Sequence, residues 1–380
     1  MFSRLYLHIP WCLSKCGYCA FNSKPLEPER LEQTCDLLIC EMQHAAATFP
    51  VKQPLHSLYF GGGTPSLLSP EQVERLISTS RSCFNHAADV EITLEANPGT
   101  VDSTSLSGYV EAGITRLSLG AQSFNDHNLR LLGRRHTKAE TIAAFAAART
   151  AGFSSIGLDL ICGLPGQNLV DWLDDLKQLL QLRPEHISVY GLSIEDGTPF
   201  AVRYPVGSQE LPDDDLLAAM LELADNQLQR VGYQHYEIAN FCLSGHQSQH
   251  NSGYWRRDGY LGIGPGAHSF LRQGWGIRWS NQSDYTTWAA SVDSGMMTQL
   301  DRHELTRDEA LSEALYLGLR MAEGISLQEL TEQFSEDIAS RFANTIRQLQ
   351  QAALVNYVNG QLSLTNRGML LSNQVFVKFV

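Results

Sequence analysis

The sequence predicts an α/β protein: a partial (β/α)6 TIM-like barrel followed by a C-terminal helical, winged-helix-like domain. Strand-like apolar runs alternate with helix-like stretches six times, an order typical of parallel sheets because each parallel connection needs a long crossover. Six units are fewer than the eight of a closed barrel, which favours an open one. Helices followed by a hairpin near the C-terminus predict the second domain.

The six predicted strands are short runs rich in Leu, Ile, Val and aromatic residues. They cover residues 4–9, 55–60, 89–96, 114–121, 155–162 and 186–193. Their nearly continuous apolar character predicts a parallel sheet with both faces covered.

Helix-like stretches separate these strands. The clearest begins after Ser69, a predicted N-cap, with Pro70 at the first helical position. Others read STSLSGYVEAG, AETIAAFAAARTAG and LVDWLDDLKQLLQL, and several stretches end at a glycine, the usual residue after a helix C-terminus.

The regular alternation stops near residue 230. A strand-like YQHYEIANF leads into a stretch rich in Gly, His and aromatic residues that ends at GWGIRW, and we expect an irregular loop there rather than a helix. Amphipathic helices follow, and Asn359-Gly360 between two short strand-like runs predicts a hairpin. We therefore divide the chain into a barrel (1–232), a flanking strand and loop region (233–300) and a C-terminal domain (301–380), which we read as a packing cap.

Composition and charge exclude several classes of function. The 380 residues include 28 Lys+Arg and 41 Asp+Glu, a net charge of -13, which repels a phosphate backbone, so no nucleic-acid partner is expected. The beginning of the chain resembles no signal peptide, and no apolar run reaches the ~20 residues of a membrane span. We expect a cytoplasmic protein.

Three cysteines follow the first predicted strand, namely Cys12, Cys16 and Cys19. The C-x-x-C at the end of this motif alone would suit a redox pair, but Pro25 and Pro28 delay the helix that such a pair needs, and Cys12 would have no role. A structural zinc site would need a fourth ligand. A four-iron cluster can be held by three thiolates with one iron left open, so we predict a [4Fe-4S] cluster. The other cysteines read as inert core thiols: Cys35, Cys40, Cys83, Cys162 and Cys242.

This C-x-x-x-C-x-x-C motif, with Tyr18 before its last cysteine and the first strand of a partial barrel before it, resembles the radical S-adenosylmethionine (SAM) superfamily. In that family the amino and carboxylate groups of SAM chelate the open iron, and the reduced cluster cleaves the sulfonium to a 5′-deoxyadenosyl radical. The resemblance implies that the three cysteines are the cluster ligands.

Residues near the C-terminal ends of the predicted strands match the SAM contacts of this family, and barrel enzymes build their sites at that rim. Gly62, Gly63 and Thr64 in FGGGTP match the stretch at the methionine amino group, where absent side chains let backbone approach a ligand. Glu95 matches the carboxylate on the ribose hydroxyls, although a strand-end Glu alone is more often a capping or salt-bridging residue. The other matches are Gln122 and Asp159, Arg134 on the segment that follows its strand, and Tyr6, which alone would be read as a core residue.

Within the superfamily, nearly the whole chain resembles the HemN and HemW branch, proteins related to oxygen-independent coproporphyrinogen III dehydrogenase. HemN carries a fourth cysteine two residues after the third and a long N-terminal extension that helps to enclose its porphyrinogen. In this chain Phe21 occupies the position of that fourth cysteine, where we expect it to lie beside the cofactor. Eleven residues precede Cys12. CAFNS and HNSGYW instead resemble the heme chaperones of the HemW type, so coproporphyrinogen dehydrogenase activity is not expected.

The resemblance implies heme as a further ligand. His250 of HNSGYW is the leading candidate for the iron ligand, with Tyr254 and Trp255 covering the porphyrin face. His246 and His268 are rivals, and a loop histidine is more often only hydrogen-bonded. Implied partners are heme and heme-accepting proteins, including respiratory, membrane-associated ones, and a homodimer is an assembly to test. Two alternatives stay open: a radical SAM enzyme acting on a porphyrinogen, and a scaffold that the cluster only stabilises.

Overall fold

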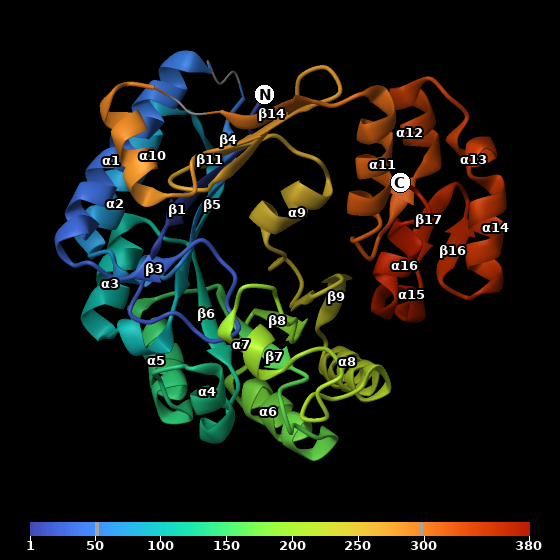
Figure 1. The fold of residues 1–380 in the computed structure, drawn as a ribbon, viewed down its shortest axis with the longest axis horizontal. Coiled ribbons are helices and arrows are strands. Elements are labelled where there is room, and N and C mark those ends of the chain that lie inside the picture. Colours follow the sequence, from blue (N-terminus) through green and yellow to red (C-terminus); the bar gives the residue numbers. More distant parts are fainter. Residues whose placement is uncertain (50–52, 297–298) are drawn as a thin grey trace.

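The computed structural model describes residues 1–49, 53–296 and 299–380. A 12-stranded sheet dominates it, with strand order β14-β13-β12-β11-β1-β4-β5-β6-β7-β8-β10-β9. Figure 1 shows this sheet curving around an interior, with the C-terminal helices and a small second sheet to one side. Strands β14 and β9 end the order and are not paired with each other, so the barrel is open, as the count of six strand–helix units predicted.

The middle of the sheet contains the six predicted strands, all paired in parallel. They are β1 (Arg4–Ile9), β4 (Leu55–Gly62), β5 (His86–Ala96), β6 (Arg116–Gln122), β7 (Ile156–Cys162) and β8 (His186–Gly191). The α/β fold class is therefore confirmed, with boundaries that differ from the predicted ones by a few residues.

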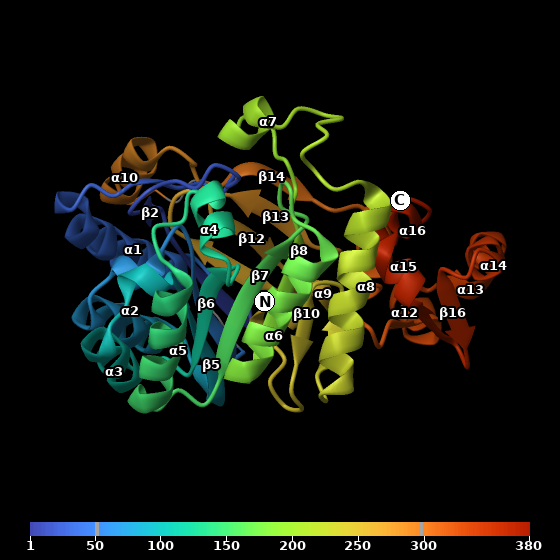
Figure 2. The same cartoon turned by 90° about the horizontal axis from the view of Figure 1, so that it is seen from below.

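Helices cover the outside of this parallel sheet, as Figure 2 shows from below. They are α1 (Glu29–Thr48), α2 (Pro70–Cys83), α3 (Ser103–Ala112), α4 (Asp126–Leu132), α5 (Lys138–Ala151), α6 (Leu169–Leu182) and α8 (Asp214–Arg230). The short helix α7 (Pro199–Arg203) lies apart from them, at the top of Figure 2. The Ser69 side chain accepts from the Gln72 N–H at the start of α2, which confirms the predicted N-cap. Left-handed glycines end α3 and α5 at Gly113 and Gly152, because only glycine adopts this conformation without strain.

The inner face of the strands is polar, which corrects the expectation of apolar strands throughout. Successive strand residues point to opposite faces, and the register pairs Arg4 with Ser57 and Tyr6 with Tyr59. These side chains meet inside the barrel, where Arg4 donates to the Ser57 hydroxyl at 3.4 Å and Tyr59 to Glu95 at 2.6 Å. The interior of this open barrel therefore holds polar groups instead of an apolar core.

The segment of residues 233–296 and 299–304 is built mostly of short regular elements, and the prediction of an irregular loop is wrong. Its elements are β9 (Gln234–Glu237), β10 (Asn240–Cys242), α9 (Gln249–Trp255), β11 (Tyr260–Ile263), β12 (His268–Leu271), β13 (Ile277–Ser280), α10 (Tyr285–Asp293) and β14 (Leu300–Glu304). Elements this short give almost no periodicity, and most of the glycines that looked like loop residues lie at the turns between them, although Gly253 lies in α9 and Gly262 in β11. Strand β11 adds in parallel to β1, so both edges of the predicted sheet are extended.

Helix α9 carries the HNSGYW sequence and lies between the sheet and the C-terminal helix α11 (Arg307–Gly318) (Figure 1). The Ser248 side chain caps it by accepting from the Asn251 N–H at 3.2 Å. The Glu91 carboxylate on β5 accepts the backbone N–H groups of Gln249 and His250 at 3.2 and 3.1 Å. A carboxylate at a helix N-terminus satisfies free amides and complements the helix dipole, which fixes α9 against β4 and β5.

The C-terminal part has its own apolar cluster and a three-stranded sheet of β15 (Ile325–Ser326), β17 (Gln361–Leu364) and β16 (Val355–Val358). Its remaining helices are α12 (Leu327–Phe334), α13 (Ile338–Arg341), α14 (Ala343–Gln351), α15 (Asn366–Leu370) and α16 (Ser372–Phe376). The predicted hairpin is present, with Asn359 and Gly360 at φ of 53° and 80°. The borders predicted at residues 232 and 300 remain a proposal. Among the described residues no helix combines the length and apolarity that crossing a membrane requires.

Candidate cofactor site

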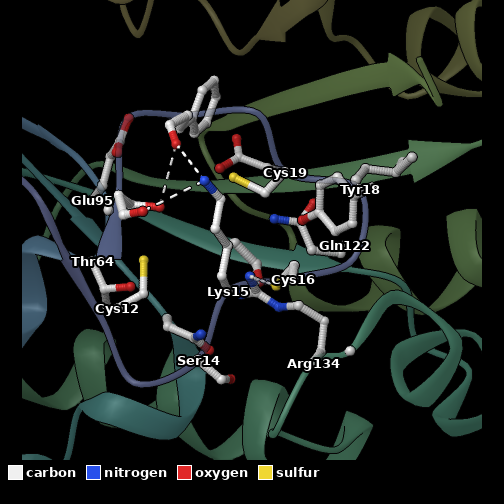
Figure 3. Close-up of a pocket in the computed structure, with 18 of the residues that line it drawn as sticks. Cys12, Ser14, Lys15, Cys16, Tyr18, Cys19, Thr64, Glu95, Gln122 and Arg134 are labelled. Carbon is white, nitrogen blue, oxygen red and sulfur yellow. Dashed lines mark hydrogen bonds between the residues drawn. The ribbon is translucent and has the colours of Figure 1, made fainter. Parts of the chain in front are cut away.

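A cavity of about 800 Å³ opens at the C-terminal ends of the central strands (Figure 3). The three motif cysteines line it together with most of the residues matched to SAM contacts. These are Phe21, Gly62, Gly63, Thr64, Glu95, Gln122, Arg134 and Asp159. Tyr6 and His250 are not among the residues that line this cavity. The structure thus brings together, around one cavity, residues that are spread from Cys12 to Asp159 in the sequence.

The cysteine loop runs between two short parallel strands, β2 (Trp11–Cys12) and β3 (Lys24–Pro25). Gly17 anchors its middle, because its N–H donates to the Leu132 carbonyl at 3.3 Å and its own carbonyl accepts from the Phe200 N–H at 2.9 Å. A Cβ on Gly17 would lie 2.7 Å from the Phe200 ring, so a larger residue would push the loop away. Ends of α4 and α7 therefore position Cys16 and Cys19.

The three thiols are free and partly exposed to the cavity. Burial raises the pKa of the Cys19 thiol above its usual value, which favours the protonated thiol while no metal is bound. In Figure 3 Lys15 is drawn among the cysteines, and its ammonium donates to the Phe21 carbonyl at 3.1 Å. Within the described ranges no three His, Cys, Asp or Glu side chains converge closely enough to hold a single metal ion. A four-iron cluster needs no such convergence, because each of its thiolates binds a different iron.

The glycines of GGGTP leave room for neighbouring parts of the chain itself. The sequence had indicated only that they leave room for a ligand. A Cβ on Gly63 would lie 2.6 Å from the Trp11 carbonyl oxygen, and one on Gly62 would lie 2.7 Å from the His8 ring. The Gly63 N–H donates to the Ile9 carbonyl and the Thr64 N–H to the Trp11 carbonyl, both at 2.7 Å. This turn therefore fastens the segment that leads into Cys12, in addition to lining the cavity.

Glu95 presents a carboxylate to the cavity from β5. Burial raises its pKa to about 7, while the hydrogen bond from the Tyr59 hydroxyl acts in the opposite direction and the Asp159 charge adds to the rise. Burial likewise raises the pKa of Asp159, which accepts from the Ser118 hydroxyl at 3.2 Å. Two carboxylates therefore face one cavity, where they can accept hydrogen bonds from ligand hydroxyl or amino groups.

Gln122 and Arg134 complete the wall opposite Glu95. Gln122 ends β6 with φ of 67°, a left-handed conformation that is strained for a residue other than glycine and often occurs at functional sites. Arg134 donates to the Gly120 carbonyl at 2.8 Å and contacts Cys16 Sγ at 3.8 Å. Its buried Nε has no hydrogen-bond partner in the described part of the chain, an unsatisfied donor that a ligand could use.

Tyr6 lies beneath the cavity and reaches the cysteine loop through two other residues. Its hydroxyl contacts His8 Nδ1 at 3.1 Å, and His8 Nε2 contacts the Asn22 carbonyl oxygen at 2.8 Å. Since a carbonyl only accepts, Nε2 carries the proton and Nδ1 accepts from Tyr6. Asn22 in turn donates to the Pro265 and Ser283 carbonyls, both at 3.0 Å. Tyr6 therefore belongs to the chain of contacts that holds the cysteine loop.

His250 is 1% exposed and lies on α9, not on a loop. Its ring nitrogens contact the Ser57 hydroxyl at 2.8 Å and the Tyr254 hydroxyl at 2.7 Å, and burial lowers its pKa well below the usual value. Both nitrogens are thus engaged, and an iron could reach one only after a hydrogen bond broke. Of the rival histidines, His246 is half-buried and His268 is exposed.

Sequence reasoning missed lining residues such as Lys15, Ser118 and Tyr190. It also missed residues that support the site from outside the cavity, among them His8, Asn22 and Tyr59. Each stands beside a motif residue, but its role depends on contacts with distant segments, which no local pattern reveals. The alternation of polar residues within the strands was the available signal, because Tyr59, Glu95 and Asp159 all occupy inward positions. Phe21, which we predicted to lie beside the cofactor, is 67% exposed and lines the cavity.

Comparisons with known proteins agree with this geometry. The family model described as Radical SAM superfamily matches residues 6–179, and that of the HemN C-terminal domain matches residues 305–371. The protein Heme chaperone HemW of Bacillus subtilis is 33% identical over 377 residues, 99% of this chain and 98% of its own length. That of Haemophilus influenzae is 45% identical over 271 residues, 70% of each chain.

A solved structure of coproporphyrinogen III oxidase (HemN) from Escherichia coli, described as a radical SAM enzyme, has a TM-score of 0.86 to this chain. It is 26% identical, and the match covers 100% of this chain and 90% of that one. The fold, the matched domains and the full-length relatives agree. The chain belongs to the HemW family, within the HemN and HemW branch of the radical SAM superfamily.

Proposed function

We propose that this protein is a heme chaperone that carries a [4Fe-4S] cluster and a SAM site and delivers heme to acceptor hemoproteins. The observation that carries the proposal is the full-length similarity to proteins named heme chaperones, combined with the cavity that collects the three cysteines and the SAM-matching residues. Phe21, at the position of the fourth HemN cysteine, supports a chaperone over a dehydrogenase.

The residues around the cavity fit both cofactors. Cys12, Cys16 and Cys19 would hold the cluster and leave one iron for the amino and carboxylate groups of SAM. When bound, the cluster supplies the electron that can cleave the sulfonium of SAM. Glu95 would accept hydrogen bonds from the ribose hydroxyls, and Gly62, Gly63 and Thr64 would lie along the methionine end. The unpartnered Nε of Arg134 is a donor suited to an anionic or carbonyl group of the ligand.

We propose His250 as the heme ligand, on the HNSGYW match, under a condition that its surroundings impose. Ligation requires the imidazole to give up Ser57 or Tyr254, so loading would involve a displacement at α9. The exposed His268 on β12 could bind iron without breaking those two hydrogen bonds. It is therefore the residue to compare with His250.

Heme spectra and heme transfer to an apo-hemoprotein, measured for His250→Ala and His268→Ala, test this assignment. His250→Ala should change the heme absorption spectrum and reduce heme transfer, whereas His268→Ala should leave both unchanged. The cluster absorption should be the same in both variants as in the unmodified protein. The reverse pattern would move the ligand to His268. If the anaerobically reconstituted protein binds no heme at all, the chaperone function is wrong.

The alternative function is that of a radical SAM enzyme acting on a porphyrinogen. The match to coproporphyrinogen III oxidase over the whole chain favours it. Incubation of the reconstituted, reduced protein with SAM and coproporphyrinogen III separates the two. We expect no decarboxylation, and protoporphyrinogen IX formed over multiple turnovers would refute the chaperone proposal.

A further inference from the structure

Tyr59 contacts Glu95, the carboxylate that we propose binds the SAM ribose, and it does so from outside the cavity. Its hydroxyl lies 2.6 Å from Glu95 Oε1, whereas Glu95 lines the cavity and Tyr59 is not among the lining residues. A phenol beside a carboxylate donates, and burial keeps the Tyr59 pKa well above its usual value, so the proton stays on the hydroxyl. The Gly62 backbone N–H also hydrogen-bonds to this carboxylate, and because each carboxylate oxygen has two lone pairs, Glu95 can still accept hydrogen bonds from a ligand in the cavity.

The Tyr59 ring itself packs against two aromatic neighbours, which also lie close to each other, with ring centroids 6.3 Å apart. It stacks on His250 with ring centroids 4.7 Å apart and an interplanar angle of 25°, and on Tyr6 at 6.1 Å and 22°. Stacked rings at such distances attract each other and restrict rotation. His250 is held in turn by Ser57 and Tyr254, so the position of the hydroxyl is set by residues from β1, β4 and α9.

We propose that Tyr59 is a positioning residue for SAM, which orients the Glu95 carboxylate toward the ribose hydroxyls. The inference rests on the proposed SAM site. It assigns a role to a residue outside the cysteine and glycine motifs, and it gives the HNSGYW helix an effect on the cavity through the stacked rings. Because a hydrogen bond to a charged group is stronger than one between neutral groups, its loss is large enough to measure as a change in SAM affinity.

The test compares binding of SAM with binding of free methionine to the reconstituted holoprotein by calorimetry. Methionine has the amino and carboxylate groups but lacks the ribose. Tyr59→Phe, which keeps the ring and removes only the hydroxyl, should weaken SAM binding by about tenfold and leave methionine binding unchanged. Tyr233→Phe is the matched control, because the Tyr233 hydroxyl also makes a buried bond, to the Pro184 carbonyl at 2.5 Å, outside the cavity; SAM binding should stay unchanged.

A double-mutant cycle separates positioning from general loss of structure. If Tyr59 acts through Glu95, then adding Tyr59→Phe to Glu95→Ala should cause no further loss of SAM affinity. Equal losses in both backgrounds, or full SAM affinity in the single variant Tyr59→Phe, would overturn the inference and leave the SAM site intact. Absence of SAM binding by the unmodified protein would instead overturn the site and the inference together.

A pH profile gives a readout that mere destabilisation does not produce. The Tyr59 hydroxyl lowers the Glu95 pKa against the rise caused by burial and by Asp159, and the phenols of Tyr6, Tyr190 and Tyr254 also face this carboxylate. Without the hydroxyl, Glu95 should become protonated at higher pH. The acid-side fall in SAM affinity should therefore move to higher pH in Tyr59→Phe, and an unmoved profile would contradict the proposal.

Discussion

At the residue scale, Gly63 shows how one position serves both the cavity and the cluster loop. A Cβ there would lie within 3 Å of the Trp11 and Ile9 carbonyl oxygens, and these backbone atoms cannot move without moving Cys12. Gly99, on the same cavity, has no contact nearer than 3.5 Å for an added Cβ. The two glycines look alike in the sequence but differ in what surrounds them.

We expect Gly63→Ala to weaken both SAM binding and retention of the cluster, because the added methyl displaces the segment that carries Cys12. Gly99→Ala should retain both. Iron and sulfide content, together with SAM calorimetry, measure the two effects separately. A Gly63→Ala protein with full iron and sulfide would show that the turn serves the ligand alone.

The cysteines give the second residue-scale prediction. Serine at Cys12, Cys16 or Cys19 should remove or greatly weaken the cluster, since a hydroxyl is a poor substitute for a thiolate ligand. Cys83→Ser is the control, because Cys83 ends α2 outside the cavity. Visible absorption and iron content after anaerobic reconstitution report the outcome, and a cluster that survived the triple substitution would contradict the assignment.

At the element scale, Glu41 ties α1 to the region added after the barrel. This buried carboxylate on α1 accepts from the Gly264 N–H at 2.8 Å, the Asn281 amide at 2.7 Å and the Trp288 indole at 3.0 Å. Trp288 lies on α10, so one side chain joins a helix near the N-terminus to segments more than 220 residues away. A helix-forming sequence around Glu41 gave no hint of this, because a buried acid in a helix resembles any other glutamate in a sequence.

Glu41→Ala should lower the free energy of unfolding by about 3–5 kcal/mol, because three buried donors lose their acceptor. The control Glu32→Ala, whose side chain on the same helix is 59% exposed, should change it by less than about 1 kcal/mol. Chemical denaturation measures both. Equal effects of the two substitutions would mean that the three contacts contribute little.

Glu41 also predicts a pH dependence. Burial raises its pKa from 4.5 to about 7, so between these values the folded protein holds a proton that the unfolded chain has released. This group therefore makes stability fall as the pH rises through that interval. Glu41→Gln should flatten this part of the profile of unfolding free energy against pH, and an unchanged slope would assign it to other groups.

At the scale of the whole molecule, a buried charge cluster joins the C-terminal part to the barrel sheet. Glu313 of α11 accepts from Arg257 at 3.1 Å and from Arg278 at 2.7 Å, and its side chain is 10% exposed. Trp275 stacks on Phe334 of α12 at 5.2 Å beside it. Removing the carboxylate would leave two guanidinium groups unpaired against an apolar contact.

We expect Glu313→Ala to destabilise the protein by about 3–5 kcal/mol and to make the connection near residue 305 more sensitive to protease. The exposed pair of Arg256 with Glu323, with side chains 48% and 61% exposed, bridges the same two parts and provides the control. Glu323→Ala should have an effect below about 1 kcal/mol. Equal protease sensitivity of both variants would show that the apolar contact alone holds the two parts together.

The sequence allowed much of this molecule to be predicted, and the failures have a common physical cause. Six parallel strands, the Ser69 cap and the Asn359-Gly360 hairpin follow from local rules of periodicity and turn geometry. The strands of residues 260–304 and helix α9 were missed because each is only a few residues long and is stabilised by neighbours distant in sequence. The same holds for the site: the motif residues were found, whereas Tyr59 and His8 required the barrel to bring strands together.

The pairing of β1 with β11 governs the order in which the chain can fold. Residues 4–7 of β1 pair with residues 260–263, and the Ser3 N–H donates to the Gly259 carbonyl at 2.8 Å, contacts of very high sequence separation. Such contacts slow folding, because a long loop must close before they form. During synthesis, β1 can pair with β4 early, but its other edge stays bare until residue 263 has been made, and a bare strand edge is a site of aggregation. The strand that leads into the cysteine loop is thus synthesised about 250 residues before the partner that completes its second edge.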